Sequence, residues 1–96
     1  MIRHVVLFKL KEATQEAADK AAQVLLSMRE NIDYIKELEV GKDFLHSPRS
    51  FDIYLSVVLE NAEMLDVYQK DEYHCDVVKK HMHEVTEKSV SIDFEL

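Results

Sequence analysis

Hydrophobic and polar residues alternate in four segments of the chain, and an alternation of period two indicates β-strands. We expect strands over residues 2–10, 35–45, 51–59 and 89–96. Both faces of the first strand carry apolar side chains, so both faces are expected to be covered. Gly41 interrupts the alternation of the second strand, which predicts a β-bulge at this position.

In the segments between the strands, apolar residues recur at the spacing of an α-helix. Thr14 is a suitable N-cap for a first helix. A short second helix is expected from Asn61 to about Gln69, and a further helical piece from Asp71 to about Thr86, with Asn61 and Asp71 as caps. The apolar stripe of the first helix contains Ala18, Ala21, Ala22, Leu25, Met28 and Ile32.

The order of elements is β-α-β-β-α-β, which predicts an α+β protein with a ferredoxin-like fold in a single domain, residues 1–96. Two helices can cover only one face of a four-stranded sheet. The second face is also apolar, and a second copy of the chain is the simplest cover, so we expect a homodimer formed through the sheet face. The residues expected on this second face are Val5, Leu7, Tyr54 and Val58.

Composition narrows the class of partner. The net charge is −7, from 19 acidic and 12 basic residues, which argues against binding nucleic acid or an anionic membrane. No apolar run reaches the roughly 18 residues of a membrane span, and the first residues contain no small-residue cleavage site of a signal peptide. The single cysteine, Cys75, cannot form an internal disulfide, which fits a reducing compartment. We therefore expect a cytoplasmic protein.

Five segments, in their order and spacing, resemble the stress-responsive dimeric α/β-barrel (Dabb) family. The resemblance covers nearly the whole chain and implies a ferredoxin-like protomer that pairs into a dimeric barrel. The segments are MIRHVVLFKLK at the start, VGKD (40–43), FDIYLSVVLEN (51–61), the stretch from Tyr68 to His74, and IDFEL at the end.

The same resemblance implies a site. Most members of the family have no assigned chemistry, but some plant members are polyketide cyclases that use a Tyr-x5-His arrangement. Tyr68 and His74 match these two positions, and His4 matches a family histidine on the first strand at the edge of the pocket. The wider superfamily also includes cofactor-free monooxygenases. The resemblance thus implies chemistry without a cofactor.

One stretch departs from the family pattern. The family commonly has His-Pro-x-His where this chain has Asp71-Glu72-Tyr73-His74. The aspartate remains a good helix cap, and the glutamate suits the positive end of the helix dipole. The two carboxylates are also expected near the pocket mouth, where they would raise the pKa of His74 or exclude acidic ligands.

Regular helical spacing assigns roles to side chains on the last helix. His74 and His81 lie on its apolar stripe and are expected to face inward, whereas Lys79 and His83 face away. An inward imidazole suits acid–base catalysis near neutral pH, so His74 is the predicted proton acceptor. Tyr68 is the predicted hydrogen-bond donor to an oxygen that becomes negatively charged.

A small apolar, carbonyl-bearing molecule is the expected ligand, and His4 would orient either this ligand or His74. No cofactor and no metal are expected. A zinc site at His4, His74 and His81 is disfavoured, because Cys75 projects to another side of the helix and no paired cysteine motif is present. The expected ligand-binding residues are His4, Val6, Phe8, Leu38, Val40, Ile53, Leu55 and His81.

Two alternatives remain open at this point. In the first, His4, Tyr68 and His74 are hydrogen-bonded core residues that pin the last helix to the sheet of a non-catalytic stress or accessory dimer. Replacing His74 with alanine would then cost about 1–3 kcal/mol of stability. In the second, the protein is a cofactor-free monooxygenase, which ranks lower because the chain has no tryptophan and no residue distinctive of that chemistry.

Overall fold

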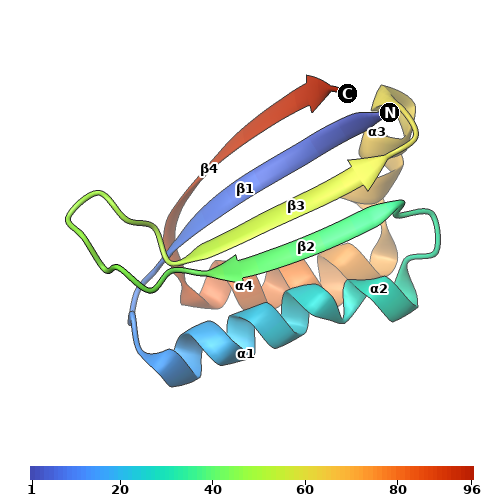
Figure 1. The fold of residues 1–96 in the computed structure, drawn as a ribbon. Helices are drawn as coiled ribbons and strands as arrows, with labels where there is room; N and C mark the ends of the chain where they lie inside the picture. The colour runs from blue at the N-terminus through green and yellow to red at the C-terminus, as the bar shows by residue number, and fades with distance from the viewer.

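The computed structural model covers residues 1–96 and contains a four-stranded sheet with all helices on one side of it (Figure 1). The predicted β-α-β-β-α-β order is confirmed, with each helical part divided into shorter pieces. No helix combines the length and the hydrophobicity that crossing a membrane requires. The elements are β1 (Ile2–Leu10), α1 (Gln15–Leu26), α2 (Met28–Asn31), β2 (Glu37–Lys42), β3 (Ile53–Leu59), α3 (Ala62–Lys70), the π-helix η1 (His74–Lys79), α4 (Lys80–Val85) and β4 (Thr86–Glu95).

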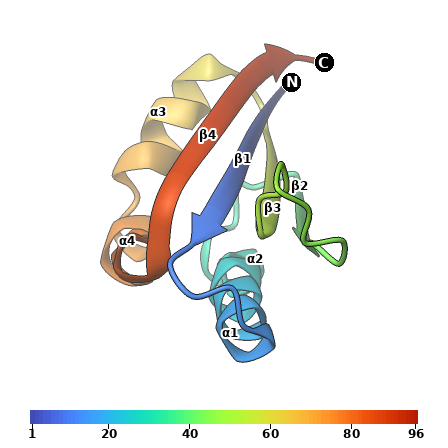
Figure 2. The same cartoon turned by 90° about the vertical axis from the view of Figure 1, so that its left-hand side faces the viewer.

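The strands lie in the order β2-β3-β1-β4, and every pair of neighbours is antiparallel. The two central strands, β1 and β3, are far apart in the sequence but hydrogen-bonded to each other along their length. Seen from the side, α1, α3 and α4 all lie against the same face of the curved sheet (Figure 2). This arrangement is the ferredoxin-like α+β fold expected from the order of elements.

Two of the predicted helix caps are present. Thr14 Oγ1 accepts a hydrogen bond from the Ala17 backbone N–H at 3.1 Å. Asn61 Oδ1 accepts one from the Met64 backbone N–H at 3.0 Å. Each bond satisfies one of the backbone donors that the first turn of a helix leaves without a partner, so these side chains help to set where α1 and α3 begin.

The bulge predicted at Gly41 is wrong. Residues 37–42 of β2 pair with β3 without any shift of register. The Tyr54 ring packs against this position, because a Cβ atom at Gly41 would lie 3.5 Å from Tyr54 Cδ2. A contact of this length is an ordinary van der Waals contact, so the strand passes through Gly41 regularly and the ring does not require a glycine there. The irregularity of the sheet lies elsewhere, between Lys9 and Leu10, where β1 pairs with β4.

The register divides the sheet into a face covered by helices and an open face. Val5 lies beside Ile92 of β4, and Ile92 is 61% exposed in the single chain. The four apolar residues predicted to share the second face do so, although Val58 is buried there. β4 adds three exposed apolar side chains to this face. We call this surface the open face; its residues are Val5, Leu7, Tyr54, Val58, Val90, Ile92 and Phe94.

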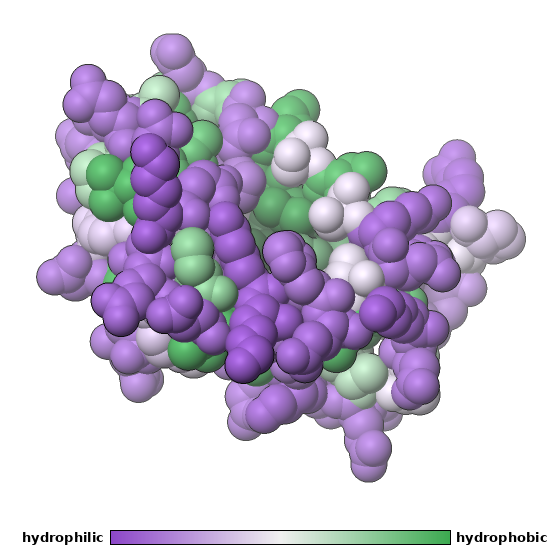
Figure 3. Space-filling view, turned by 180° about the vertical axis from the view of Figure 1, so that it is seen from behind, coloured by the Kyte–Doolittle hydropathy of each residue, from purple (hydrophilic) through white to green (hydrophobic).

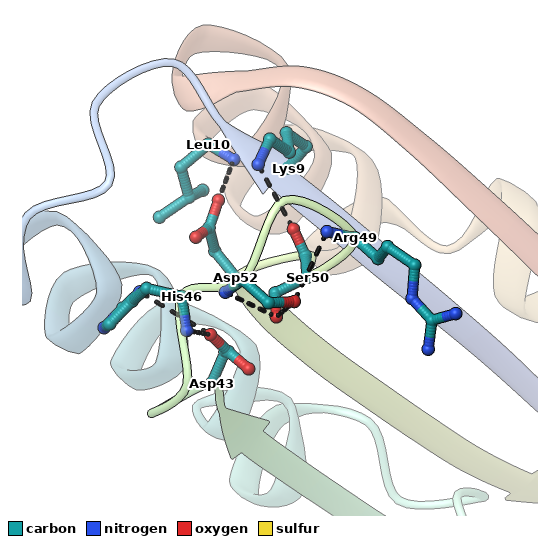
Figure 4. A network of polar contacts seen from close by, with 8 residues as sticks. Lys9, Leu10, Asp43, His46, Arg49, Ser50 and Asp52 are labelled. Atoms are coloured by element: carbon teal, nitrogen blue, oxygen red, sulfur yellow. Dashed lines mark hydrogen bonds and ion pairs between the residues drawn. The ribbon is translucent and has the colours of Figure 1, made fainter.

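The long loop at residues 43–52 projects beyond the sheet but is anchored to the end of β1 (Figure 4). The Asp52 carboxylate is buried and accepts a hydrogen bond from the Leu10 backbone N–H at 2.8 Å. Lys9 Nζ donates to the Ser50 carbonyl oxygen at 3.1 Å. These bonds satisfy polar groups where β1 leaves the sheet, and they fix the end of the loop that leads into β3.

Candidate functional site

A cavity of ≈ 230 Å³ lies between the covered face of the sheet and the helical segment from α3 to α4. This volume corresponds to about eight water molecules at ~30 Å³ each. On the side where α3 and α4 run, hydrophobic side chains gather in a hollow within a largely hydrophilic surface (Figure 3). We call this space the histidine cavity; its lining residues are His4, Val6, Phe8, Leu25, Leu55, Tyr68, Gln69, His74, Val78, Lys79, Met82, His83, Thr86, Ser89 and Ser91.

His4 is held by a carboxylate from the edge strand. The β1–β4 register places His4 directly opposite Asp93, and His4 Nδ1 hydrogen-bonds to Asp93 Oδ1. Because a carboxylate accepts this bond, Nδ1 is the donor, and in the neutral imidazole Nε2 is then the nitrogen with the lone pair. The imidazole is 93% buried by the strand pair and lines the histidine cavity. Asp93 is therefore paired within the chain.

Tyr68 lies between two imidazoles. Its ring stacks on His74 with 4.0 Å between the ring centroids, and His4 meets it edge-on at 5.9 Å. His74 Nδ1 donates a hydrogen bond to the Tyr68 backbone carbonyl at 2.8 Å. This bond uses Nδ1 as the donor, as in His4, and no hydrogen bond of the chain includes Nε2 of His74. The three polar residues singled out in the sequence therefore lie together at one cavity.

Burial lowers the pKa of His74 to about 4, because the positively charged imidazolium would lose its hydration. The bond to the Tyr68 carbonyl and the charge of Asp71 act in the opposite direction, while the charge of Lys79, and that of His4 whenever it is protonated, lowers the pKa further. The side chain is therefore neutral at pH 7. The expected increase in the pKa of His74 from nearby carboxylates is wrong, because the desolvation of the ring outweighs them.

Asp71 acts as a helix cap and does not lie at the entrance of the histidine cavity. Its Oδ1 accepts the His74 backbone N–H at 3.0 Å, and its Oδ2 accepts the Tyr34 hydroxyl at 3.1 Å. Burial, together with this bond to Asp71, raises the pKa of Tyr34 to about 12, so the hydroxyl stays a donor. Neither Asp71 nor Glu72 lines the histidine cavity. The cap is confirmed, and the predicted position of the carboxylates at the mouth is wrong.

The Tyr68 hydroxyl points into the protein core. It donates to Met28 Sδ at 3.6 Å, and the whole Tyr68 side chain is inaccessible to solvent. Burial raises the pKa of Tyr68, with smaller contributions from Tyr34 and Asp71. The hydroxyl therefore does not reach the histidine cavity, to which this residue contributes only its ring. This geometry does not fit the predicted donation to an oxyanion.

A π-helical segment changes which side chains face the cavity. In η1 the backbone hydrogen bonds span five residues instead of four, so each turn uses one more residue than an α-turn. As a result Lys79 and His83, which regular spacing placed on the outer face, line the histidine cavity. His81, predicted to face the ligand, does not line it, and its Nε2 is buried without a partner. The predicted roles of His81 and His83 are therefore reversed.

The predicted apolar wall is only partly right. Val6, Phe8 and Leu55 line the histidine cavity, because they lie on the two central strands. Side chains of β2 lie at the opposite edge of the sheet from β4, where α1 packs on them. The predicted wall residues that pack in other parts of the core are Leu38, Val40 and Ile53.

The histidines do not form a metal site. No group of three or more His, Cys, Asp or Glu side chains in the chain is arranged to hold a metal ion. His81 lies away from the pair at the cavity, and Cys75 directs its thiol to the Gln69 carbonyl oxygen at 3.3 Å. Its neighbour Lys79 donates to the same carbonyl at 3.0 Å.

A second hollow of ≈ 290 Å³ lies between the start of α1 and the loop at residues 43–52. Its charged groups are occupied by one another or by the backbone. Lys42 Nζ pairs with Asp19 Oδ1 at 2.6 Å, and Asp52 accepts the Leu10 N–H. The histidine cavity differs because two imidazole Nε2 atoms beside it have no partner, so it is the better candidate site.

Comparisons with known proteins agree with the fold. A family model described as the stress responsive A/B barrel domain matches residues 2–96. No curated protein matches the sequence. Among solved structures, a dimeric ferredoxin-like protein of unknown function from Thermobifida fusca has 20% identity and a TM-score of 0.84, over 99% of this chain and 90% of that one.

Two further structures are similar over 99% of this chain. A dimeric protein of unknown function with a ferredoxin-like fold, from Bacteroides fragilis, has 22% identity and a TM-score of 0.82, with 95% of its own chain covered. A hydroxynitrile lyase from Passiflora edulis has 17% identity and a TM-score of 0.80, with 92% of its chain covered. At these identities the likeness establishes the ferredoxin-like fold and leaves the chemistry to the residues of this chain.

Proposed function

We propose that this chain, which belongs to the stress-responsive A/B barrel domain (Dabb) family, binds a small carbonyl-bearing molecule in the histidine cavity and acts on it by cofactor-free acid–base chemistry. One observation carries the proposal. Two imidazoles, each held at Nδ1 by an acceptor of the chain, leave their Nε2 lone pairs beside the same cavity. Oriented imidazoles next to an apolar cavity are typical of general acid–base sites.

His4 is the proton acceptor in this proposal. Asp93 holds its ring in one tautomer and would stabilise the imidazolium that forms, as a carboxylate does for a catalytic histidine. His4 Nε2 removes a proton from the carbon next to the carbonyl group; the electron pair of that C–H bond forms a carbon–carbon double bond, and the π pair of the carbonyl group moves to its oxygen to give an enolate. The proton returns from Nε2 to carbon or to a leaving group.

The role of His74 in this proposal differs from that of proton acceptor, which the sequence predicts. With a pKa of about 4 it is a weak base and carries no proton on Nε2 at pH 7. It can accept a hydrogen bond from a hydroxyl or enol group of the ligand and so orient it against His4. The hydroxynitrile lyase of similar fold supports a carbonyl-forming or carbonyl-consuming reaction as the class.

We also propose that the working form is a homodimer joined through the open face. Structures of similar fold are described as dimeric. The open face of this chain exposes Val90, Ile92 and Phe94 on β4, and a monomer would leave this apolar strand in water. Two such sheets packed face to face form the α/β barrel that gives the family its name.

Deuterium exchange tests the chemistry without knowledge of the natural substrate. Phenylacetone in D₂O loses its α-proton NMR signals when a base removes these protons. We expect the protein to accelerate this loss, and His4→Gln to slow it by about a hundredfold or more. His46→Gln, in the exposed loop, is the control and should keep the wild-type rate. Exchange that is equally fast with wild type and His4→Gln would contradict the proposed role of His4.

The second candidate function is a purely structural role of His4, Tyr68 and His74. One observation favours it, because the Tyr68 hydroxyl and His74 Nδ1 both have hydrogen-bond partners within the core. In that case the protein is a non-catalytic accessory dimer and the histidine cavity holds only water. Isothermal titration with phenylacetone separates the two functions. Saturable binding that a bulky cavity-filling substitution, Ser91→Phe, abolishes supports a ligand site, and the absence of binding supports the structural role.

A further inference from the structure

We propose that the histidine cavity selects an anionic amphiphile, a small molecule with an apolar body and one carboxylate, and that Lys79 binds the carboxylate. This inference rests on the proposed ligand-binding function and specifies the class of ligand.

The charged side chain in the lining is opposite in sign to the net charge of the protein, and the carboxylate that contacts the lining, Asp93, is paired with His4. The chain has 19 acidic residues and a net charge of −7. None of the 15 lining residues is aspartate or glutamate, and Lys79 is the one lysine or arginine among them. The lining thus contains one positive charge and no carboxylate, although the protein is acidic. This arrangement attracts a negatively charged ligand to this position.

Lys79 has unused binding capacity. The residue is half-buried, and Nζ donates one hydrogen bond, to the Gln69 carbonyl oxygen at 3.0 Å. None of the ion pairs of the chain includes Lys79. An ammonium group has three donors, so the remaining ones are available to a ligand. The charge of Lys79 also reaches the site, because it contributes to lowering the pKa of His74.

The lining has a buried part, which contains apolar side chains together with the two imidazoles, and an exposed part that is polar. The deep part consists of almost fully buried side chains such as Leu25, Leu55 and Val78. The exposed part carries the hydroxyls of Ser89 and Ser91, which the strand register places on the same face as His4. An apolar tail therefore fits inward, with a carboxylate outside against Lys79 and the two serines.

A single carboxylate fits better than a phosphate. One ammonium group, with no arginine beside it, matches one negative charge, whereas a phosphate dianion is usually met by several cations or by an arginine fork. The cavity has room for about eight waters by volume, which is the size of a short fatty acid or a small aromatic acid.

Matched probes of equal length separate charge from hydrophobicity. We would titrate the protein with hexanoate, hexan-1-ol and hexylamine by calorimetry at pH 7.5. We expect hexanoate to bind about tenfold to a hundredfold more tightly than hexan-1-ol, which is the value of a hydrogen bond to a charged group. Hexylamine should bind most weakly, because its ammonium group faces that of Lys79.

Lys79→Gln is the decisive variant, since it removes the charge while an amide can still donate to the Gln69 carbonyl. We expect it to weaken hexanoate by about tenfold to a hundredfold and leave hexan-1-ol within about twofold. Lys79→Arg should restore most of the hexanoate affinity. Lys80→Gln, which removes the same charge from the exposed neighbouring position, should leave both affinities unchanged.

The outcomes distinguish this inference from the function on which it rests. Equal affinity of wild type for hexanoate and hexan-1-ol would overturn anion selection and leave the cavity as a binding site. The same loss of hexanoate binding in Lys80→Gln as in Lys79→Gln would overturn the role of Lys79. The absence of binding by every probe would overturn both the inference and the proposed ligand site.

Discussion

Replacing His74 with glutamine should change how the stability of the protein depends on pH. The pKa of His74 is lowered from 6.5 to about 4 in the folded chain, mainly by burial. Between these two values the unfolded chain binds a proton at this side chain and the folded chain does not. Stability from the neutral imidazole is therefore fully present above pH 6.5 and is lost progressively as the pH falls towards 4.

The size of the effect follows from the two pKa values. At about pH 5, linkage gives a loss of about 2 kcal/mol relative to pH 7. Water that enters the histidine cavity can reach Nε2 and partly hydrate the ring, so we expect a loss of about 1–2 kcal/mol. His74→Gln has no proton to bind at this position, and its stability should fall by that much less over the same range.

Urea unfolding followed by far-ultraviolet circular dichroism measures this difference. Wild type, His74→Gln and His46→Gln would be compared at about pH 7 and pH 5, at one protein concentration because a dimer unfolds in a concentration-dependent way. The other titrating groups are shared and cancel in the comparison. Equal losses of stability in wild type and His74→Gln would refute the neutral, buried state of this imidazole.

Three further substitutions test other parts of the structure. Ile92→Asp on the open face should convert the dimer to a monomer in sedimentation analysis, whereas Val67→Asp, an exposed apolar position on α3, should not; a dimeric Ile92→Asp would contradict the interface. Asp52→Ala should lower the free energy of unfolding by about 1–3 kcal/mol in urea titrations, because it leaves a buried backbone N–H without its acceptor; an unchanged unfolding midpoint would count against that anchor. Tyr68→Phe loses only a weak bond to Met28 sulfur, so we expect about 1 kcal/mol or less of destabilisation and an unchanged rate of deuterium exchange in phenylacetone. A loss of exchange would show that the Tyr68 hydroxyl takes part in the reaction.

The fold could be predicted from the sequence because local signals and the tertiary structure agree. Period-two alternation located all four strands, and the side chains of Thr14 and Asn61 cap the helices that they were expected to cap. The presence of only two helical regions correctly indicated that helices cover one face of the four-stranded sheet. The bulge expected at Gly41 was wrong, because the strand pairs regularly through this glycine although the alternation of side chains is interrupted there.

The site could be predicted only in part, because two of its determinants are not local. A π-turn in η1 shifts the helical phase, so regular spacing placed His81 at the ligand and His83 outside. The partner of His4 is Asp93, 89 residues away, and only the register of β1 with β4 brings them together.

The pKa of His74 was misjudged for a related reason. The sequence shows which carboxylates are near in the chain but not how completely a ring is buried. Asp71 does act on His74 in the expected direction, yet burial of the ring has the larger effect. The sequence pattern therefore predicts the direction in which a neighbouring carboxylate shifts the pKa of His74. Whether burial outweighs that shift is decided by the packed structure.

Nitrogen-15 NMR of the histidine side chains gives the most direct test of the site. The measurement is a long-range ¹H–¹⁵N correlation spectrum at pH 7.5, recorded during titration with phenylacetone. We expect His4 and His74 to show the tautomer protonated at Nδ1, and their Nε2 signals to shift in a saturable way while those of His46 stay constant. Protonation at Nε2 in both residues, or signals that do not respond to the ligand, would contradict a catalytic or ligand-binding role for this pair.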